Sequence, residues 1–231
     1  MKLADYNGHL ITLCLMATGT FAIGTDAFIV AGVLSDISDT FAVSPAQAGQ
    51  LISVFALAYM LFAPLTAWLL GNVNRKHILQ LALVLFIAGN LACAWATSYL
   101  QISFGRVLAA LGAACYTPQA AAAAVGLVAE KRRGLAISIV YGGMTLAIAL
   151  GIPFGTFLAK LIGWREIFLF IALLGAIALL GLSLALRAIA PPGKHSLKER
   201  LAPLRQKAVL TTLLITFFAV CSEHIVYSYV I

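Results

Sequence analysis

The chain has 231 residues, of which 62% are hydrophobic and 10% are charged, and its formal net charge is +7. Together with a mean hydropathy of +1.02, this composition excludes an ordinary soluble domain and indicates a protein that crosses a membrane several times. The four cysteines all lie in apolar stretches, so no disulfide framework is expected.

Six apolar stretches are long enough to span a membrane, since crossing about 30 Å of hydrocarbon takes ~20 residues of helix. They cover residues 10–34, 48–71, 78–98, 101–127, 135–159 and 167–187, and a seventh stretch covers 208–231. None shows the regular polar stripe of a soluble helix. The first stretch is too long for a cleaved signal peptide, so we expect it to be retained as the first helix.

Basic residues gather in alternate connections between these stretches. Twelve of the fifteen follow this pattern: Lys2, Arg75, Lys76, Lys131, Arg132, Arg133, Arg187, Lys194, Lys198, Arg200, Arg205 and Lys207. By the positive-inside rule, the N-terminus and the basic linker are expected in the cytoplasm, whereas the loop at 34–47 and the turn at 160–166 face outward. A nucleic-acid-binding patch would not alternate with topology, so the charge does not indicate such a partner.

The six spans divide into two sets of three, joined outside the membrane near residues 98–101. This pattern is typical of the three-plus-three inverted repeat of many secondary transporters. We therefore expect an all-α membrane protein with a six-helix bundle at 1–187 and one extra transmembrane helix at 208–231. A basic cytoplasmic linker at 188–207 is expected between them, with a short amphipathic helix at 197–204.

Three charged residues are expected well inside spans, namely Asp26, Arg106 and Glu223. Burying such a charge costs at least ~2.5 to 3.5 kcal/mol, so it usually faces a cavity or a partner. Asp26 and Arg106 lie about eight and about six residues from the outer ends of their spans, so their depths are similar and they are able to pair. Asp26 is either a proton-coupling group or half of a structural ion pair. Arg106 either faces a cavity or extends outward to the interface.

The fifth span carries small residues at a spacing of four, namely Gly143, Ala147, Gly151 and Gly155. A bare helix face of this kind allows another helix to approach closely. Pro153 removes a backbone hydrogen bond and predicts a bend. The face indicates either ordinary tight packing or a close, bendable contact that moves during function.

The order of several short motifs resembles the major facilitator superfamily, and more narrowly its twelve-span drug:proton antiporters, in the branch with sugar and nucleoside exporters. The likeness covers essentially the whole chain. The matching residues are Gly24-Thr25-Asp26-Ala27-Phe28, Ala63-Pro64-Leu65, Asn74-Arg75-Lys76, Arg106, Arg132-Arg133-Gly134, Gly151 to Thr156 with Pro153 and Gly155, and Gly163-Trp164-Arg165 with Phe168.

The resemblance implies export of a small organic molecule, driven by inward proton flow, through alternating access about a central cavity. It assigns proton coupling to Asp26 and Arg106 and a gating turn to Asn74, Arg75 and Lys76. It also implies an antiporter-type helix face, a cavity lined from spans one and four, and the inner membrane of a bacterial-type cell. The helix-face residues are Gly143, Gly151, Pro153 and Gly155. Four further side chains of spans one and four either line the cavity or serve as helix contacts, namely Phe21, Phe28, Tyr116 and Gln119.

Two departures from the family pattern stand out. Asn74 replaces the usual Asp of the gating turn, although Asn still caps a helix N-terminus well. Ala110 stands where the fourth span commonly has Gly. Because the family has twelve spans, the resemblance also implies a second half beyond the seventh stretch.

The expected function is therefore a proton-coupled efflux permease for a drug, sugar or nucleoside, apparently truncated. One alternative is a non-transporting fragment or split-gene product of such a transporter. Another is an uptake symporter of the same fold, because topology does not determine direction. An enzyme is not expected, since the sequence has no metal-spaced cluster, phosphate-binding Gly loop or nucleophile elbow. The expected partners are the substrate, protons and the lipid bilayer, with no cofactor.

Overall fold

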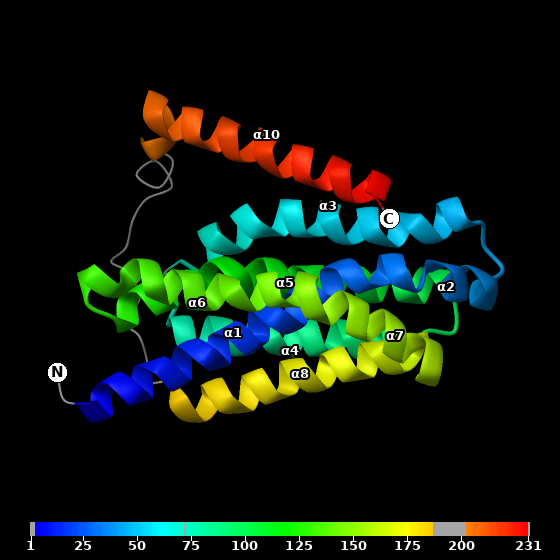
Figure 1. Ribbon diagram of the computed structural model, residues 1–231, viewed down its shortest axis with the longest axis horizontal. Coiled ribbons are helices and arrows are strands. Elements are labelled where there is room, and N and C mark those ends of the chain that lie inside the picture. Colours follow the sequence, from blue (N-terminus) through cyan, green and yellow to red (C-terminus); the bar gives the residue numbers. More distant parts are fainter. Residues whose placement is uncertain (1–2, 72, 187–201, 231) are drawn as a thin grey trace. The chain divides into compact units, whose positions relative to one another are not determined.

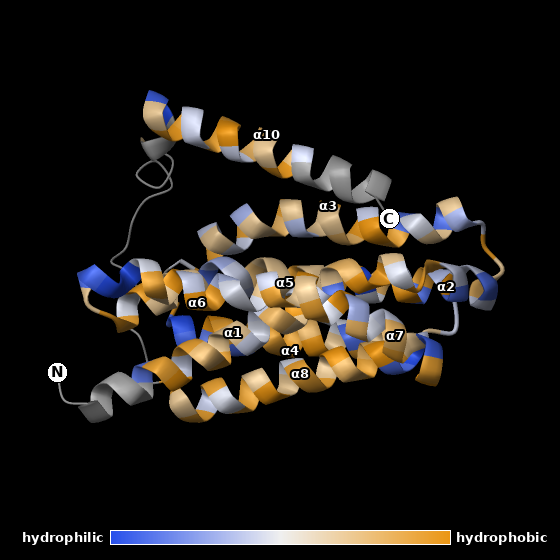
Figure 2. Ribbon diagram, viewed as in Figure 1, coloured by the Kyte–Doolittle hydropathy of each residue, from blue (hydrophilic) through white to orange (hydrophobic). Residues whose placement is uncertain are grey.

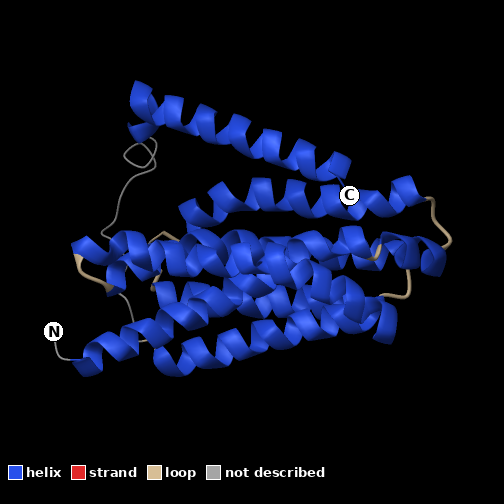
Figure 3. Cartoon of the chain, viewed as in Figure 1, coloured by secondary structure: helices blue, strands red, loops and turns tan. Residues whose placement is uncertain are grey.

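A computed structural model describes the backbone of residues 3–71, 73–186 and 202–230, and the side chains of 9–71, 73–186, 202 and 205–222. The described backbone is helical with short connections and contains no strand (Figures 1 and 3). The chain separates into two compact units, Met1–Pro191 and Pro192–Ile231. The first unit holds the bundle and therefore the candidate site.

The helices of the first unit follow one another with short connections. They are α1 (Leu3–Gly32), α2 (Leu34–Phe41), α3 (Pro45–Leu69), α4 (Arg75–Ala94), α5 (Tyr99–Leu127), a 3-10 turn (Glu130–Arg132), α6 (Arg133–Leu146), a π turn (Ala147–Gly151), α7 (Ile152–Ile162) and α8 (Trp164–Ala185). The second unit holds a 3-10 turn (Ala202–Arg205) and α10 (Lys207–Val230).

Six helical segments of the first unit are long and apolar enough to cross a membrane, which confirms the six predicted spans. They are His9–Gly32, Pro45–Leu69, Arg75–Ala94, Tyr99–Leu127, Glu130–Ile162 and Trp164–Ala185. Figure 2 shows hydrophobic residues along all of them. In α10 the apolar part among the described residues is Lys207–Ser222, which is shorter than these six. The side chains of Glu223 and His224 lie outside the described residues.

Side-chain caps fix where three spans begin. Ser44 Oγ accepts a hydrogen bond from the Gln47 backbone N–H at the start of α3, where Pro45 occupies the first helical position. Asn74 Oδ1 caps α4, and Ser98 Oγ caps α5. Ser and Asn suit this role because their short side chains satisfy backbone donors that the first turn leaves without partners.

Two local predictions need correction. The segment predicted as the loop 34–47 contains a helix, α2, because Ile37 buries its side chain completely against the bundle while Asp36 and Asp39 remain exposed. The fifth span, predicted at 135–159 as a helix with a bend at Pro153, instead contains a π turn. Its α6 and α7 are joined by a π turn that ends at Gly151, two residues before Pro153. A proline disturbs the α-helical hydrogen bonds of the preceding turn, which explains the position of the π turn.

The two sets of three spans pack in corresponding ways, with α1 equivalent to α5, α3 to α6 and α4 to α8. Helix α1 packs mainly against α6 and α8, whereas α5 packs mainly against α3 and α4. Helices α4 and α8 pack against each other. This is the pattern of neighbours that the predicted three-plus-three repeat requires.

The basic linker predicted at 188–207 falls largely outside the described residues, as does most of the amphipathic helix predicted at 197–204. Within that range the structure describes the 3-10 turn Ala202–Arg205 and the start of α10. Helix α8 ends at Ala185, and the two compact units divide between Pro191 and Pro192.

Candidate functional site

The centre of the bundle holds a buried ion pair between α1 and α5. Arg106 Nη1 lies 2.7 Å from Asp26 Oδ1, and both side chains have an exposed fraction of 0%. The same Nη1 donates a second hydrogen bond, of 3.3 Å, to the Asp26 backbone carbonyl. The structure thus brings together the two charged residues whose similar depths indicated that they are able to pair. Arg106 does not extend to the interface.

The pair leaves several polar atoms without hydrogen-bond partners. Among the described residues, Asp26 Oδ2 and Arg106 Nε and Nη2 are buried and make no hydrogen bond. Nε and Nη2 form one edge of the guanidinium, so that whole edge remains available. Buried polar atoms normally have partners, and exceptions mark functional positions or sites for water or ions. The ion pair is therefore incompletely satisfied on both its acidic and its basic side.

An aromatic residue covers the flat face of the guanidinium. The Arg106 Cζ atom lies 4.2 Å from the centre of the Phe55 ring on α3. A cation over a ring face is attracted by the ring's negative centre, and the attraction grows when water is excluded. Phe55 itself stacks on Tyr59, one helical turn along α3, with ring centres 6.5 Å apart. Three spans therefore contribute to the site, and the sequence reading missed the contribution of α3.

The small residues around Asp26 place the π turn directly against α1. A side chain at Gly24 would meet Ala147, and one at Gly151 would meet the hydroxyl of Thr25. Gly24 and Thr25 immediately precede Asp26 in α1. The irregular turn of the fifth span therefore packs on the stretch of α1 that presents the acid.

The rest of the small-residue face also packs on α1. A Cβ added at Gly143 would collide with the Ala17 carbonyl oxygen and with Thr20, and one at Gly155 would meet Ile29. Thr20 Oγ1 donates a hydrogen bond to the Val140 carbonyl across this contact. The face thus permits tight packing within the bundle, whereas the Pro153 side chain is exposed.

A second close helix contact, which the sequence reading missed, lies between α4 and α5. A Cβ at Gly89 would strike the backbone of Ala109 and the Gly105 carbonyl, and a Cβ at Gly112 would strike the backbone of Phe86. Glycines in two consecutive predicted spans, Gly89 in one and Gly105 and Gly112 in the next, could have indicated this contact from the sequence. This contact fixes the position of α5, and hence of Arg106, since Gly105 precedes it directly.

The candidate cavity-lining residues have different surroundings. Phe21, Phe28 and Gln119 are partly exposed. Tyr116 is fully buried, its ring lies against Gly19, and its hydroxyl donates a 3.1 Å hydrogen bond to the Met16 carbonyl. Tyr116 therefore joins α5 to α1 in this structure.

The predicted gating turn at Asn74, Arg75 and Lys76 connects α3 to α4 and contacts α8. Lys76 Nζ donates a 2.8 Å hydrogen bond to the Ser183 carbonyl, and Gln80 Nε2 donates another of 2.8 Å to the Ser183 hydroxyl. Arg75 Nη1 is buried without a hydrogen-bond partner among the described residues. The turn is thus anchored to α8 through Lys76.

The opposite end of the bundle is held by Trp164 and Arg165 at the start of α8. Arg165 Nη2 donates a 2.8 Å hydrogen bond to the Ala96 carbonyl, and its Cζ lies 4.2 Å from the Trp164 ring centre. Trp164 Nε1 donates a 3.1 Å hydrogen bond to Thr40 Oγ1. These contacts tie α2 and the turn before α5 to α8. Within the part of the chain that the structure describes, no cluster of His, Cys, Asp or Glu suits a metal ion.

Comparison with known sequences identifies the family of this chain. The family model described as the Major Facilitator Superfamily matches residues 16–231. "Uncharacterized MFS-type transporter YbcL" of Bacillus subtilis (strain 168) is 32% identical over 215 residues, which are 93% of this chain and 55% of that protein. "Inner membrane transport protein YdhP" of Escherichia coli (strain K12) is 32% identical over 218 residues, which are 94% of this chain and 56% of that protein.

Solved structures show the same fold. A bacterial homolog to the human lysosomal transporter Spinster, in an inward-facing and unoccupied conformation, matches with a TM-score of 0.66 and 28% identity over 85% of this chain and 45% of that chain. A peptide transporter POT in complex with sulfate matches with a TM-score of 0.69 and 18% identity over 94% of this chain and 46% of that chain. The chain spans about half the length of the relatives it matches.

Proposed function

This chain belongs to the major facilitator superfamily, and we propose that it acts in proton-coupled export of a small organic molecule, such as a drug, sugar or nucleoside. We place it in the inner membrane of a bacterial cell with the N-terminus in the cytoplasm. The name of the Escherichia coli relative supports the membrane. The basic residues at the connecting turns, Arg75, Lys76 and Lys131 to Arg133, support the orientation.

The observation that carries the proposal is the buried pair of Asp26 and Arg106. An intramembrane acid with one basic partner is a typical proton-relay group. Protonation of Asp26 removes the negative charge from the pair and leaves Arg106 buried without compensation. Loss of one partner of a buried pair costs about 3 to 5 kcal/mol, which is enough to shift a population between two helix arrangements.

The polar atoms that the pair leaves without partners support exchange of a proton for the cargo. A hydroxyl group of a neutral cargo donates a stronger hydrogen bond to Asp26 Oδ2 when the carboxylate is ionised than when Oδ2 carries a proton, and an adjacent oxygen of the cargo accepts from the open edge of Arg106. Such a cargo favours the ionised carboxylate and competes with the proton. Competition at one site is what antiport requires, because cargo and proton then bind in opposite steps.

The test uses inside-out membrane vesicles that are acidified by respiration and monitored with acridine orange. Cargo added outside these vesicles meets the cytoplasmic face, so an exporter releases the pH gradient when it takes the cargo up. We expect D-xylose or inosine, two neutral compounds with adjacent hydroxyl groups, to release the gradient in vesicles with the wild-type protein. Asp26→Asn is expected to abolish that release while the protein still inserts in normal amounts.

Asp36→Asn is the matched control. Asp36 is exposed on α2, so this substitution removes the same charge at a position outside the site. It should release the gradient as the wild type does. Full release by Asp26→Asn would disprove the role of Asp26. A symporter, the alternative for this fold, would release the gradient only when the cargo is loaded inside the vesicles.

A second candidate, a chain that does not transport by itself, is favoured by the chain's coverage of only 55% and 56% of two relatives. Producing the 231 residues alone in the same vesicles separates the two functions. Cargo-dependent release without any other chain would exclude this second candidate.

A further inference from the structure

A row of aromatic and hydroxyl side chains leads away from the ion pair across α3, α5 and α6. Phe55, whose ring covers Arg106, also stacks on Tyr59, with ring centres 6.5 Å apart and an interplanar angle of 26°. The Tyr59 side chain hydrogen-bonds with Thr117 of α5 and interacts electrostatically with Tyr141 of α6. We call these last three residues the tyrosine site. Phe55 connects this site to the ion pair.

The tyrosine site lies deep within the membrane. Tyr59 is near the middle of its span, and Thr117 and Tyr141 each stand at least ten residues, or about 15 Å, from both ends of theirs. Tyr141 is nevertheless 42% exposed. Tyrosines in contact with lipid gather at the membrane interfaces, whereas polar groups at this depth face a bundle interior or a water-filled cavity. The exposed part of Tyr141 is therefore expected to line a cavity.

The hydrogen bonds of the tyrosine site leave one acceptor available. Thr117 Oγ1 donates a 3.2 Å hydrogen bond to the Ala113 carbonyl. Because a hydroxyl group has one proton, Thr117 Oγ1 accepts from Tyr59, which therefore donates its own proton. The Tyr59 oxygen keeps lone-pair capacity for a further donor. An N–H group on a bound ring is a donor of the required kind.

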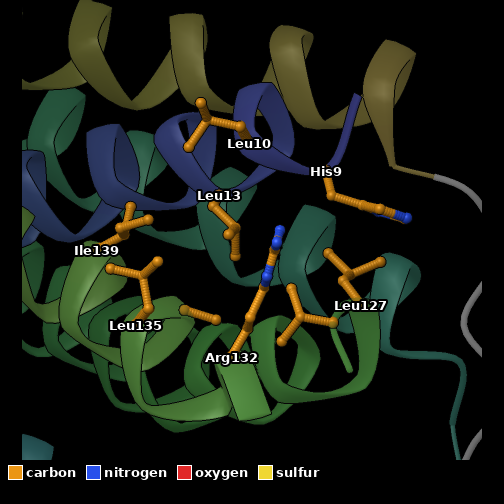
Figure 4. A pocket seen from close by; sticks show the side chains of 9 residues that line it. His9, Leu10, Leu13, Leu127, Arg132, Leu135 and Ile139 are labelled. Carbon is orange, nitrogen blue, oxygen red and sulfur yellow. The ribbon is translucent and has the colours of Figure 1, made fainter. Parts of the chain in front are cut away.

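A small pocket elsewhere in the bundle does not offer these features. It lies where α1 begins, α5 ends and α6 begins, and Leu13, Leu127 and Leu135 converge there around the Arg132 side chain (Figure 4). None of the nine described residues that line it carries a hydroxyl group. Its cavity volume of about 30 Å³ is far below the ~300 Å³ of the smallest usual ligand pockets. The tyrosine site is therefore the better place for a ring.

We propose that the tyrosine site binds a planar heteroaromatic ring that carries an N–H donor, such as the base of inosine. The ring stacks on Tyr141, and its N–H donates to the Tyr59 oxygen. The inference rests on the proposed function, since it assigns a nucleoside-type cargo to the same site, with the ribose hydroxyls at Asp26 and Arg106. A sugar without a base occupies only the part of the site formed by the ion pair.

Equilibrium dialysis of the purified 231-residue chain in detergent tests the proposal with radiolabelled inosine, its base hypoxanthine and its sugar D-ribose. The wild type is expected to bind inosine about tenfold more tightly than D-ribose, because stacking of one base on an aromatic ring contributes roughly that factor. Hypoxanthine should bind more weakly than inosine, since it lacks the ribose hydroxyls. Equal binding of inosine and D-ribose would overturn the tyrosine site, and equal binding of hypoxanthine and inosine would overturn the nucleoside assignment.

Two substitutions separate the stacking from the hydrogen bond. Tyr141→Leu should weaken inosine binding by about tenfold and leave D-ribose binding unchanged. Tyr59→Phe keeps the stack on Phe55 but removes the acceptor, so it should weaken inosine binding by about fivefold. The same substitution should not affect 1-methylinosine, whose methyl group replaces the ring N–H. An equal effect of Tyr59→Phe on inosine and 1-methylinosine would contradict the hydrogen bond.

Two matched controls lie outside the tyrosine site. Tyr99→Phe removes a hydroxyl that donates a 2.6 Å hydrogen bond to the Gln47 carbonyl, and Phe154→Leu removes an exposed aromatic ring from the fifth span. Neither should change inosine binding, and losses equal to those of Tyr59→Phe and Tyr141→Leu would overturn the proposal. Dialysis measures binding alone. Inosine binding that depends on Tyr141, without release of the pH gradient in vesicles, would support the tyrosine site and contradict export.

Discussion

Asp26 and Arg106 are separated by about eighty positions in the sequence, yet Asp26 Oδ1 and Arg106 Nη1 lie 2.7 Å apart with both side chains completely buried. The pair joins α1 of the first set of three spans to α5 of the second. A buried pair is only weak evidence for stability, because desolvation of two charges offsets much of their attraction. Its sensitivity to the loss of one charge is what makes it suitable for coupling.

Arg106→Met is expected to destabilise the protein by about 3 to 5 kcal/mol, since it leaves Asp26 buried without a positive partner. The double variant Asp26→Leu with Arg106→Met should recover most of that loss, because no isolated charge remains in the bundle. Chemical unfolding in detergent micelles measures both. Arg133→Met, an exposed position, serves as the control. If Arg106→Met were as stable as the wild type, protonation of Asp26 would compensate fully for the loss of Arg106, which would contradict the expected loss of unfolding free energy.

Gly143→Ala is expected to destabilise the protein by about 1 to 3 kcal/mol, because the added Cβ meets the backbone carbonyl of Ala17, which has little room to move. Gly142→Ala is the matched control on the same helix, where a Cβ meets nothing within 4 Å. That change should stabilise the protein by up to ~1 kcal/mol through helix propensity. Thermal unfolding of the two variants should therefore shift in opposite directions, and a shift in the same direction would contradict the packing.

Pro153→Ala is expected to slow cargo-dependent release of the pH gradient without unfolding the protein. Alanine supplies the backbone N–H that proline lacks, so the π turn at Ala147–Gly151 loses its cause and the α-helix becomes continuous. The packing against Gly24 and Thr25 then changes. Release is measured in the vesicle assay, and hydrogen exchange follows the π turn.

Pro45→Ala is the control for that prediction, because Pro45 stands in the first turn of α3, where its missing N–H costs no helical hydrogen bond. It should leave release of the gradient unchanged. If Pro153→Ala changed hydrogen exchange at the π turn but released the pH gradient as the wild type does, the π turn would not be needed for transport.

Arg165→Leu is expected to cost about 1.5 to 3 kcal/mol, the contribution of a hydrogen bond to a charged group, because it removes the donor to the Ala96 carbonyl and the stack on Trp164. Lys160→Leu, which removes an exposed charge near the same end of the bundle, should cost less than about 0.5 kcal/mol. The difference in unfolding midpoint between the two variants measures the contribution of the contact. Equal midpoints would exclude a stabilising role for Arg165.

The six spans and the two charges of the site were predictable because each depends on a quantity written along the chain. Bilayer thickness sets the length of an apolar helix, and the cost of an intramembrane charge singles out Asp26 and Arg106. The position of α2 was missed because an eight-residue helix between two spans resembles a loop in hydropathy. An effect of Pro153 on the fifth span was predicted as a bend, whereas its observed form, a π turn at Ala147–Gly151, was not predicted.

By itself, therefore, the sequence determined the number of spans, the charged residues inside them and the small-residue face of the fifth. Only the tertiary structure decided that Phe55 covers Arg106, that the small-residue face packs on α1, and that Arg132 enters an apolar pocket. The physical reason is that these helices are apolar on every side, so hydropathy does not identify which face points inward. In a membrane that choice depends on the close fit of small and large side chains between helices.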